Sequence, residues 1–141
     1  EVRADARLRE TFAGEGEGLS RVELLERHGD EVARWASDSA ARPGGGETRI
    51  EVADRVVAAI TDGLDELAES GTLVVATHGG AARAGIGALL ELPPEQWACL
   101  GVLSNCAWSI LSENSTGFGP AWRLQEYNAG SLPTPALADD R

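Results

Sequence analysis

The sequence predicts a single α/β domain, and three observations support this prediction. A short apolar run at residues 72–77 has the length and composition of a strand that helices cover on both faces. Two amphipathic helical patterns precede this run, and a third helical pattern, rich in Ala and Gly, follows it. Two alternating segments then predict a β-hairpin. The predicted order of elements is therefore helix, helix, strand, helix and hairpin.

The length and charge of the chain restrict the classes of protein that it can belong to. Its 141 residues are enough for one domain with a packed core. The chain has 12 basic residues, all of them Arg, against 23 acidic residues, which gives a formal net charge of −11. Nucleic acids and membrane surfaces are anionic, so neither is expected as a partner. No apolar run of about 18 residues and no secretory signal is present, which predicts a cytoplasmic protein.

The first two helices carry the same start signal. Ser20 and Glu23 match a capping box, in which the hydroxyl and the carboxylate each accept a hydrogen bond from a free amide. Thr48 and Glu51 repeat this pattern at the start of the second helix. An apolar stripe is expected along that helix, made of Ile50, Ala53, Val56, Val57, Ile60, Leu64 and Leu67.

The segment at residues 72–77 is predicted to be a strand inside a parallel or mixed sheet. Such a strand needs hydrogen-bonded neighbours, so we expect partner strands upstream of Glu1. The next helix is predicted from Ala81 to about Glu91. Strands around Trp108 and Trp122 are expected to pair across a polar loop, and residues 129–141 are expected to form a disordered tail.

A candidate functional residue follows the predicted strand directly. In open α/β sheets, ligands bind beyond the carboxyl ends of strands, where the amides at a helix N-terminus favour anions. His78 lies at this place, and Gly79 and Gly80 would let the backbone approach a ligand closely. The pattern favours a site for an anion such as phosphate. A structural histidine that is hydrogen-bonded to nearby backbone remains open as an alternative.

Several short motifs occur in the order and spacing of a known family. They are Leu8-Arg9-Glu10, Gly14-Glu15-Gly16-Glu17-Gly18-Leu19, Gly45-Gly46-Glu47 and Val74-Val75-Ala76-Thr77-His78-Gly79-Gly80. Together they resemble the C-terminal motifs of the histidine phosphatase superfamily, also called the phosphoglycerate-mutase-like family. The segments around Trp108 and Trp122 are similar to those of actinobacterial phosphatases such as the glucosyl-3-phosphoglycerate phosphatases.

This resemblance implies a fold class and a division of the chain. The expected fold is a three-layer α/β/α sandwich of the phosphoglycerate-mutase-like type, lacking its N-terminal strand or strands and ending in a β-hairpin. Residues 1–128 are expected to be the C-terminal part of a single histidine-phosphatase domain.

The resemblance also implies roles for individual residues. His78 matches the second active-site histidine, which donates a hydrogen bond to the phosphoryl oxygens. Glu10 matches the proton donor, which protonates the leaving oxygen and later activates water. Gly79, Gly80 and Arg83 match phosphate- or substrate-binding positions, although a helix-surface ion pair remains an alternative for Arg83. No metal and no cofactor are expected.

The nucleophile of the family is a histidine in an Arg-His-Gly motif at the end of the first strand, which we expect upstream of Glu1. The tripeptide Arg27-His28-Gly29 has these residues, but it lies in a helical pattern and follows Glu10, so we interpret it as a chance match. Glu47 and Arg55 match recurring family positions, and we assign them mainly an architectural role.

The expected function is hydrolysis of a phosphomonoester through a phosphohistidine intermediate, with a small phosphorylated metabolite as substrate. This activity would belong to the intact domain, because the present segment supplies the acid and the second histidine. A phosphoglycerate mutase is one alternative, but mutases generally have Gly-Asn where Gly79-Gly80 follows His78. A non-catalytic, anion-binding fragment is another. A homodimer is also left open.

Overall fold

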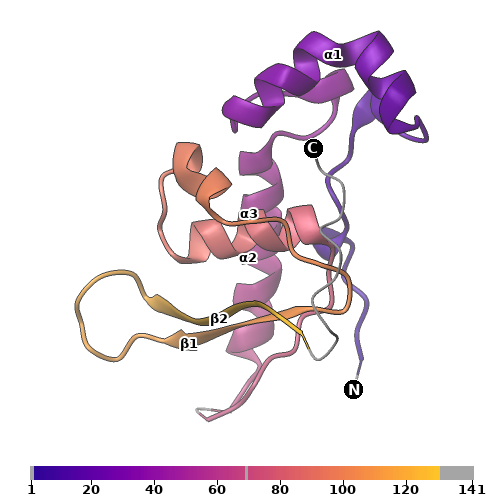
Figure 1. Cartoon of the computed structure of the whole chain (residues 1–141). Helices are drawn as coiled ribbons and strands as arrows, with labels where there is room; N and C mark the ends of the chain where they lie inside the picture. The colour runs from indigo at the N-terminus through magenta and orange to yellow at the C-terminus, as the bar shows by residue number, and fades with distance from the viewer. Residues whose placement is uncertain (1, 69, 131–141) are drawn as a thin grey trace.

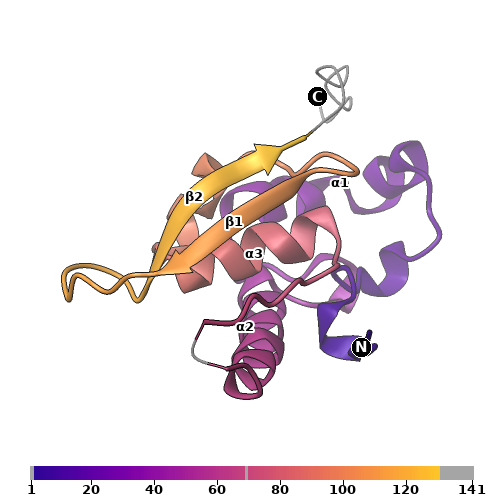
Figure 2. The same ribbon diagram turned by 90° about the horizontal axis from the view of Figure 1, so that it is seen from below.

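The computed structural model describes residues 2–68 and 70–130 of the chain. Its α-helices and the two strands of the hairpin follow the predicted order, but the strand predicted at residues 72–77 is not among its elements. They are α1 (Arg21–Ser37), α2 (Arg49–Asp65), α3 (Gly79–Leu89), β1 (Trp108–Glu113) and β2 (Trp122–Ala129). Helices α2 and α3 cross at the centre of the molecule, and α1 lies at one end (Figure 1). The hairpin of β1 and β2 runs alongside α3 on the side away from α1 (Figure 2).

Both predicted capping boxes are confirmed. The Ser20 hydroxyl accepts a hydrogen bond from the Glu23 amide at 3.3 Å, and the Glu23 carboxylate accepts one from the Ser20 amide at 2.9 Å. The hydroxyl of Thr48 and the carboxylate of Glu51 are linked to each other's amides in the same way, at 3.1 and 2.9 Å. These bonds satisfy amides that have no partner inside the helix, so both helices begin where the sequence predicts.

The core lies where α2 and α3 cross. Its buried side chains are Val52, Ala53, Val56, Ala81, Ala84 and Trp97. The close crossing requires small residues on α3, because a Cβ atom at Gly85 would lie 2.5 Å from Cγ1 of Val56. The prediction for the apolar stripe of α2 was partly wrong. Ile50 is 36% exposed, whereas Val52 is fully buried, because the face that meets α3 is rotated about the helix axis from the face expected.

The segment at residues 72–77 differs from the prediction. It is extended, but it has no paired strand within the described part of the chain, and Val74 is 86% exposed. No other described segment runs along its edges to exchange backbone hydrogen bonds, so the predicted sheet around it is not seen there. The C-terminal end of this segment is nevertheless fixed to the N-terminal segment, because the Thr77 hydroxyl donates to the Leu8 carbonyl at 2.6 Å. The existence of partner strands outside residues 1–141 stays a prediction.

Three smaller expectations can also be compared with the structure. Helix α3 begins at Gly79 instead of Ala81, so His78 is the residue that precedes the helix directly. Strands β1 and β2 pair as an antiparallel hairpin, as predicted, with Leu111 opposite Leu124. The expected tail at residues 129–141 falls almost entirely outside the described residues, although residue 129 ends β2.

Two features are absent from residues 2–68 and 70–130. None of the helices described there is long and apolar enough to cross a membrane. The same residues contain no cluster of three His, Cys, Asp or Glu side chains that could hold a metal ion.

The crossing of α2 and α3 leads to a stability prediction. Gly85→Ala is expected to lower the free energy of unfolding by about 1–3 kcal/mol, because the added methyl group would overlap Val56. Urea unfolding measures this change. Gly29→Ala in α1 is the matched control, since its Cβ would meet nothing within 4 Å and alanine favours a helix. Equal stabilities of the two variants would contradict the close packing.

Candidate active site

One guanidinium group holds the segment that carries Glu10. Arg55, on α2, donates from Nη1 to the carbonyl oxygens of Arg7 at 2.6 Å and Arg9 at 2.8 Å. Its Nη2 donates to the carbonyl oxygen of Glu10 at 3.1 Å. The Arg55 side chain is only 13% exposed, so the donor is largely shielded from water, while the Arg9 and Glu10 carbonyl groups that accept from it lie at the surface. The backbone around Glu10 is therefore fixed relative to α2.

Glu47 completes this arrangement. Its carboxylate accepts from Nε of Arg55 at 2.8 Å and from Nη2 at 2.9 Å, in the two-pronged geometry that guanidinium groups favour. Glu47 and Phe12 also exchange two hydrogen bonds, one from each backbone amide. The hydrogen bonds from Arg55 lower the pKa of Glu47 below its ordinary value of 4.5. The architectural role predicted for Glu47 and Arg55 is confirmed by these contacts.

The Glu10 carboxylate lies at the N-terminus of α3. It accepts from the amide of Gly80 at 3.0 Å and from the amide of Ala81 at 2.9 Å. The Thr11 amide donates to the same carboxylate at 2.8 Å. Free amides and the positive end of the helix dipole both favour an anion there. In this structure that anion is Glu10, so two amides expected to face a ligand already have a partner.

His78 directly precedes α3, and its side chain is exposed. Within the described residues its imidazole has no hydrogen-bond partner, so the alternative of a structural histidine bonded to backbone is not seen. The fold thus brings the turn that follows His78 next to Glu10, although Glu10 and Gly80 are 70 residues apart in sequence.

The two glycines after His78 lie in close contact with other parts of the chain. A Cβ atom at Gly79 would lie 3.1 Å from the carbonyl oxygen of Leu103, and one at Gly80 would lie 2.7 Å from Oε1 of Glu10. What approaches the backbone of Gly80 is therefore the Glu10 carboxylate. Phosphate binding by Gly79 and Gly80 stays a prediction.

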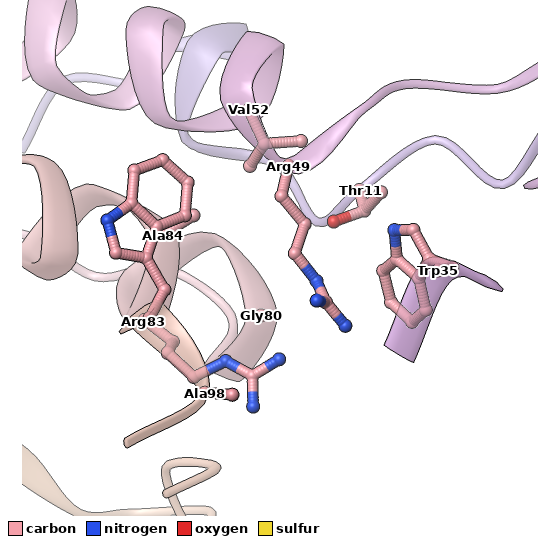
Figure 3. Close-up of a pocket in the computed structure, with 9 residues that line it drawn as sticks. Thr11, Trp35, Arg49, Val52, Gly80, Arg83, Ala84 and Ala98 are labelled. Carbon is pink, nitrogen blue, oxygen red and sulfur yellow. The ribbon is translucent and has the colours of Figure 1, made fainter. Parts of the chain in front are cut away.

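A pocket beside this turn contains a second group of residues. Its lining includes Thr11, Gly80 and Arg83, together with Arg49 and Trp35 (Figure 3). Within the described chain, Arg83 forms no ion pair, so the helix-surface pair considered for it is not seen. The Arg49 guanidinium carbon lies 4.3 Å from the centre of the Trp35 ring. The sequence pattern did not single out Arg49 and Trp35 as pocket residues, because each stands in an ordinary helical pattern.

The tripeptide Arg27-His28-Gly29 lies inside α1, as predicted. His28 has a backbone conformation that interrupts the helix, with φ −132° and ψ 25°, and its Nδ1 is 3.7 Å from Oε1 of Glu31. Its side chain is therefore on a helix and not at the end of a strand.

Known proteins share the sequence pattern and the fold of this chain. A family model described as "Histidine phosphatase superfamily (branch 1)" matches residues 1–129. The chain belongs to the histidine phosphatase superfamily, and the resemblance inferred from the motifs is confirmed.

Two mycobacterial proteins are among those similar to this chain. The glucosyl-3-phosphoglycerate phosphatase of Mycolicibacterium vanbaalenii is 31% identical over 143 residues, which cover 92% of this chain and 64% of that protein. The protein of the same name from Mycobacterium tuberculosis is 34% identical and is covered to 63% of its length, again with 92% of this chain. The chain therefore spans less than two thirds of these relatives.

A solved structure supports the fold class. The mycobacterial glucosyl-3-phosphoglycerate phosphatase in complex with VO3 superimposes with a TM-score of 0.81 at 32% identity. The match covers 92% of this chain and 66% of that structure. The predicted fold class, that of the phosphoglycerate-mutase-like phosphatases, is thereby confirmed.

The contributions of Arg55 and Glu47 to the free energy of unfolding should be strongly non-additive. Arg55→Gln is expected to lower the free energy of unfolding by about 3 kcal/mol, because it leaves a largely buried carboxylate and several carbonyl groups with fewer donors. A double-mutant cycle with Glu47→Gln, followed by urea unfolding, measures the coupling. The exposed pair Arg3–Glu66 is the control and should show little coupling. Equal coupling in both pairs would be evidence against this role of Arg55.

The lowered pKa of Glu47 makes the contribution of this pair depend on pH. A carboxyl whose pKa is lower in the folded state stabilises the fold fully above its ordinary pKa, here 4.5, and loses this contribution as the pH falls through the folded-state pKa. Glu47→Gln should therefore be less stable than wild type at neutral pH, and this difference should shrink below pH 4.5. Urea unfolding over this range measures it, and a constant difference would refute the assignment.

Proposed function

We propose that this protein is a phosphomonoester hydrolase that acts on a small phosphorylated metabolite through a phosphohistidine intermediate and without a metal ion. The observation that carries the proposal is the position of the Glu10 carboxylate at the N-terminus of α3, beside the turn that follows His78. This is where a phosphoryl group approaching the end of the 72–77 segment would meet both an acid and a histidine. The similarity to two glucosyl-3-phosphoglycerate phosphatases supports the same activity class.

In this proposal Glu10 is the proton donor. The oxygen that leaves a phosphomonoester is an alkoxide unless it receives a proton, so a positioned acid lowers the barrier. Three backbone amides orient the Glu10 carboxylate, and Arg55 fixes its backbone. After the first step, the same carboxylate would accept a proton from the water that attacks the phosphohistidine.

His78 is proposed to bind the phosphoryl oxygens. Its exposed imidazole has no partner among the described residues, so it can donate to a ligand without breaking a bond within the protein. Gly79, Gly80 and Arg83 are proposed to complete the binding of phosphate or substrate. A donor aimed at the equatorial oxygens stabilises the charge that develops on them in the transition state.

The nucleophilic histidine is proposed to lie in an Arg-His-Gly motif outside residues 1–141. The tripeptide Arg27-His28-Gly29 lies within α1, where His28 interrupts the helix. It is therefore not at the end of a strand, where this nucleophile is expected. Residues 1–128 are accordingly proposed to be part of one histidine-phosphatase domain, which acts in the cytoplasm.

The test is hydrolysis of p-nitrophenyl phosphate by the intact protein in the presence of a chelator. His78→Ala is expected to lower kcat by about 10²–10³-fold, the cost of losing one donor to a transition-state oxygen. His28→Ala is the matched control and should keep its activity, because His28 lies within α1. Full activity of His78→Ala would refute the site, and metal-dependent turnover would refute the proposed chemistry.

A further inference from the structure

The segment at residues 101–104 lies against the turn that follows His78. A Cβ atom at Gly79 would lie 3.1 Å from the carbonyl oxygen of Leu103. The segment leads from the short helix at Pro94–Cys99 toward β1, and in Figure 1 this orange part of the chain passes the start of α3. It belongs to no helix or strand. Contacts with other parts of the chain must therefore fix its path beside the turn.

Two neighbouring residues near the end of β2 supply such contacts. The Asn128 side chain accepts a hydrogen bond from the amide of Ser104 at 2.7 Å. The Tyr127 hydroxyl donates to the carbonyl oxygen of Gly101. Both side chains are partly buried. The two bonds join β2 to the first and the last residue of the segment, so the part that faces the turn after His78 is fixed from both sides.

An irregularity in the hairpin explains how both residues reach this segment. The register of the two strands shifts between Trp108 and Ile110, which leaves an extra residue on β2. Asn128 lies in this bulge with φ 52°, a left-handed conformation that asparagine tolerates better than most residues. Neighbouring side chains of a regular strand point to opposite faces, whereas a bulge can redirect one of them. Tyr127 and Asn128 can therefore contact the same segment.

We propose that Asn128 and Tyr127 are positioning residues for His78, which act through residues 101–104 and the backbone of Gly79. Neither residue touches the substrate. They keep the exposed imidazole, which has no partner among the described residues, at the place where the phosphoryl oxygens bind. A donor stabilises a transition state only when it is correctly aligned, so loss of this support should lower kcat more than it raises KM. The inference rests on the proposed function, since it takes His78 to bind the phosphoryl group.

The test removes one hydrogen bond at a time from the intact protein. Asn128→Gly removes the acceptor of the Ser104 amide and keeps a residue that adopts a positive φ freely. It is expected to lower kcat for p-nitrophenyl phosphate by about tenfold or more, with KM changed by less than about threefold. Asn128→Asp retains an acceptor oxygen and should keep kcat within about threefold of wild type. Tyr127→Phe, the milder second variant, should lower kcat by about three- to tenfold.

Asn114→Gly is the matched control, because it removes an asparagine side chain from the other end of the same hairpin. Nδ2 of Asn114 donates to the carbonyl oxygens of Phe118 at 2.6 Å and Pro120 at 2.9 Å, in the loop that joins β1 to β2. The control should lower the free energy of unfolding, as Asn128→Gly does, and leave kcat unchanged. Urea unfolding measures the stability of both variants. Equal kcat values in the two variants would show that Asn128 is merely structural and would overturn the inference.

A double-mutant cycle with His78→Ala measures whether Asn128 acts through the imidazole. Once the imidazole is absent, Asn128→Gly should change kcat by less than about twofold. Losses that multiply in the double mutant overturn the inference. If hydrolysis depends on His78 and is unaffected by Asn128→Gly, the proposed function stands and the positioning role fails.

A spectroscopic measurement separates the two proposals when there is no turnover. The amide NMR signals of Gly79 and Gly80 are expected to shift in Asn128→Gly and to stay in place in Asn114→Gly. If they behave in this way but wild type does not hydrolyse p-nitrophenyl phosphate, the support of the turn by Asn128 is confirmed and the hydrolase assignment fails. Unshifted signals in Asn128→Gly overturn the positioning role whatever the activity.

Discussion

The arrangement of the site depends on the guanidinium group of Arg55. This one side chain donates to three backbone carbonyl groups of the N-terminal segment and to both oxygens of the Glu47 carboxylate. The segment has little regular structure of its own, only the short turn Ala6–Leu8, so its own backbone bonds do not fix its path. A charged donor shielded from water makes stronger hydrogen bonds than an exposed one, which explains how one side chain can fix several residues.

The position of Glu10 shows how architecture and proposed chemistry share the same atoms. The carboxylate caps α3 at close range, since a Cβ atom at Gly80 would lie 2.7 Å from its Oε1. The capping bonds orient the carboxylate toward the turn of His78. The fold therefore fixes where the proposed acid lies, and the carboxylate must take up a proton and give up an accepted hydrogen bond before it can donate.

The charge distribution has a local exception at one pocket. The chain as a whole is strongly acidic, with a net charge of −11, yet Arg49 and Arg83 are directed into one pocket without a carboxylate among its described lining residues. Two guanidinium groups without a neighbouring carboxylate make the local potential positive, and salt screens the negative field of more distant charges. The stacking of Arg49 on Trp35 keeps the charge at the pocket instead of in bulk water.

Elements whose stabilising contacts are local could be predicted from the sequence. The capping boxes at Ser20 and Thr48, the three helices and the hairpin were predicted because their hydrogen bonds and periodicity involve residues close in the chain. The motifs indicated Glu10 and His78 as candidate site residues, through their resemblance to a known family. Three contacts could not be predicted in this way: the Glu10 carboxylate binds the amide of Gly80, α2 buries Val52 instead of Ile50, and Arg49 stacks on Trp35. Those contacts join distant segments, and their geometry follows from how the helices cross, which no local pattern encodes.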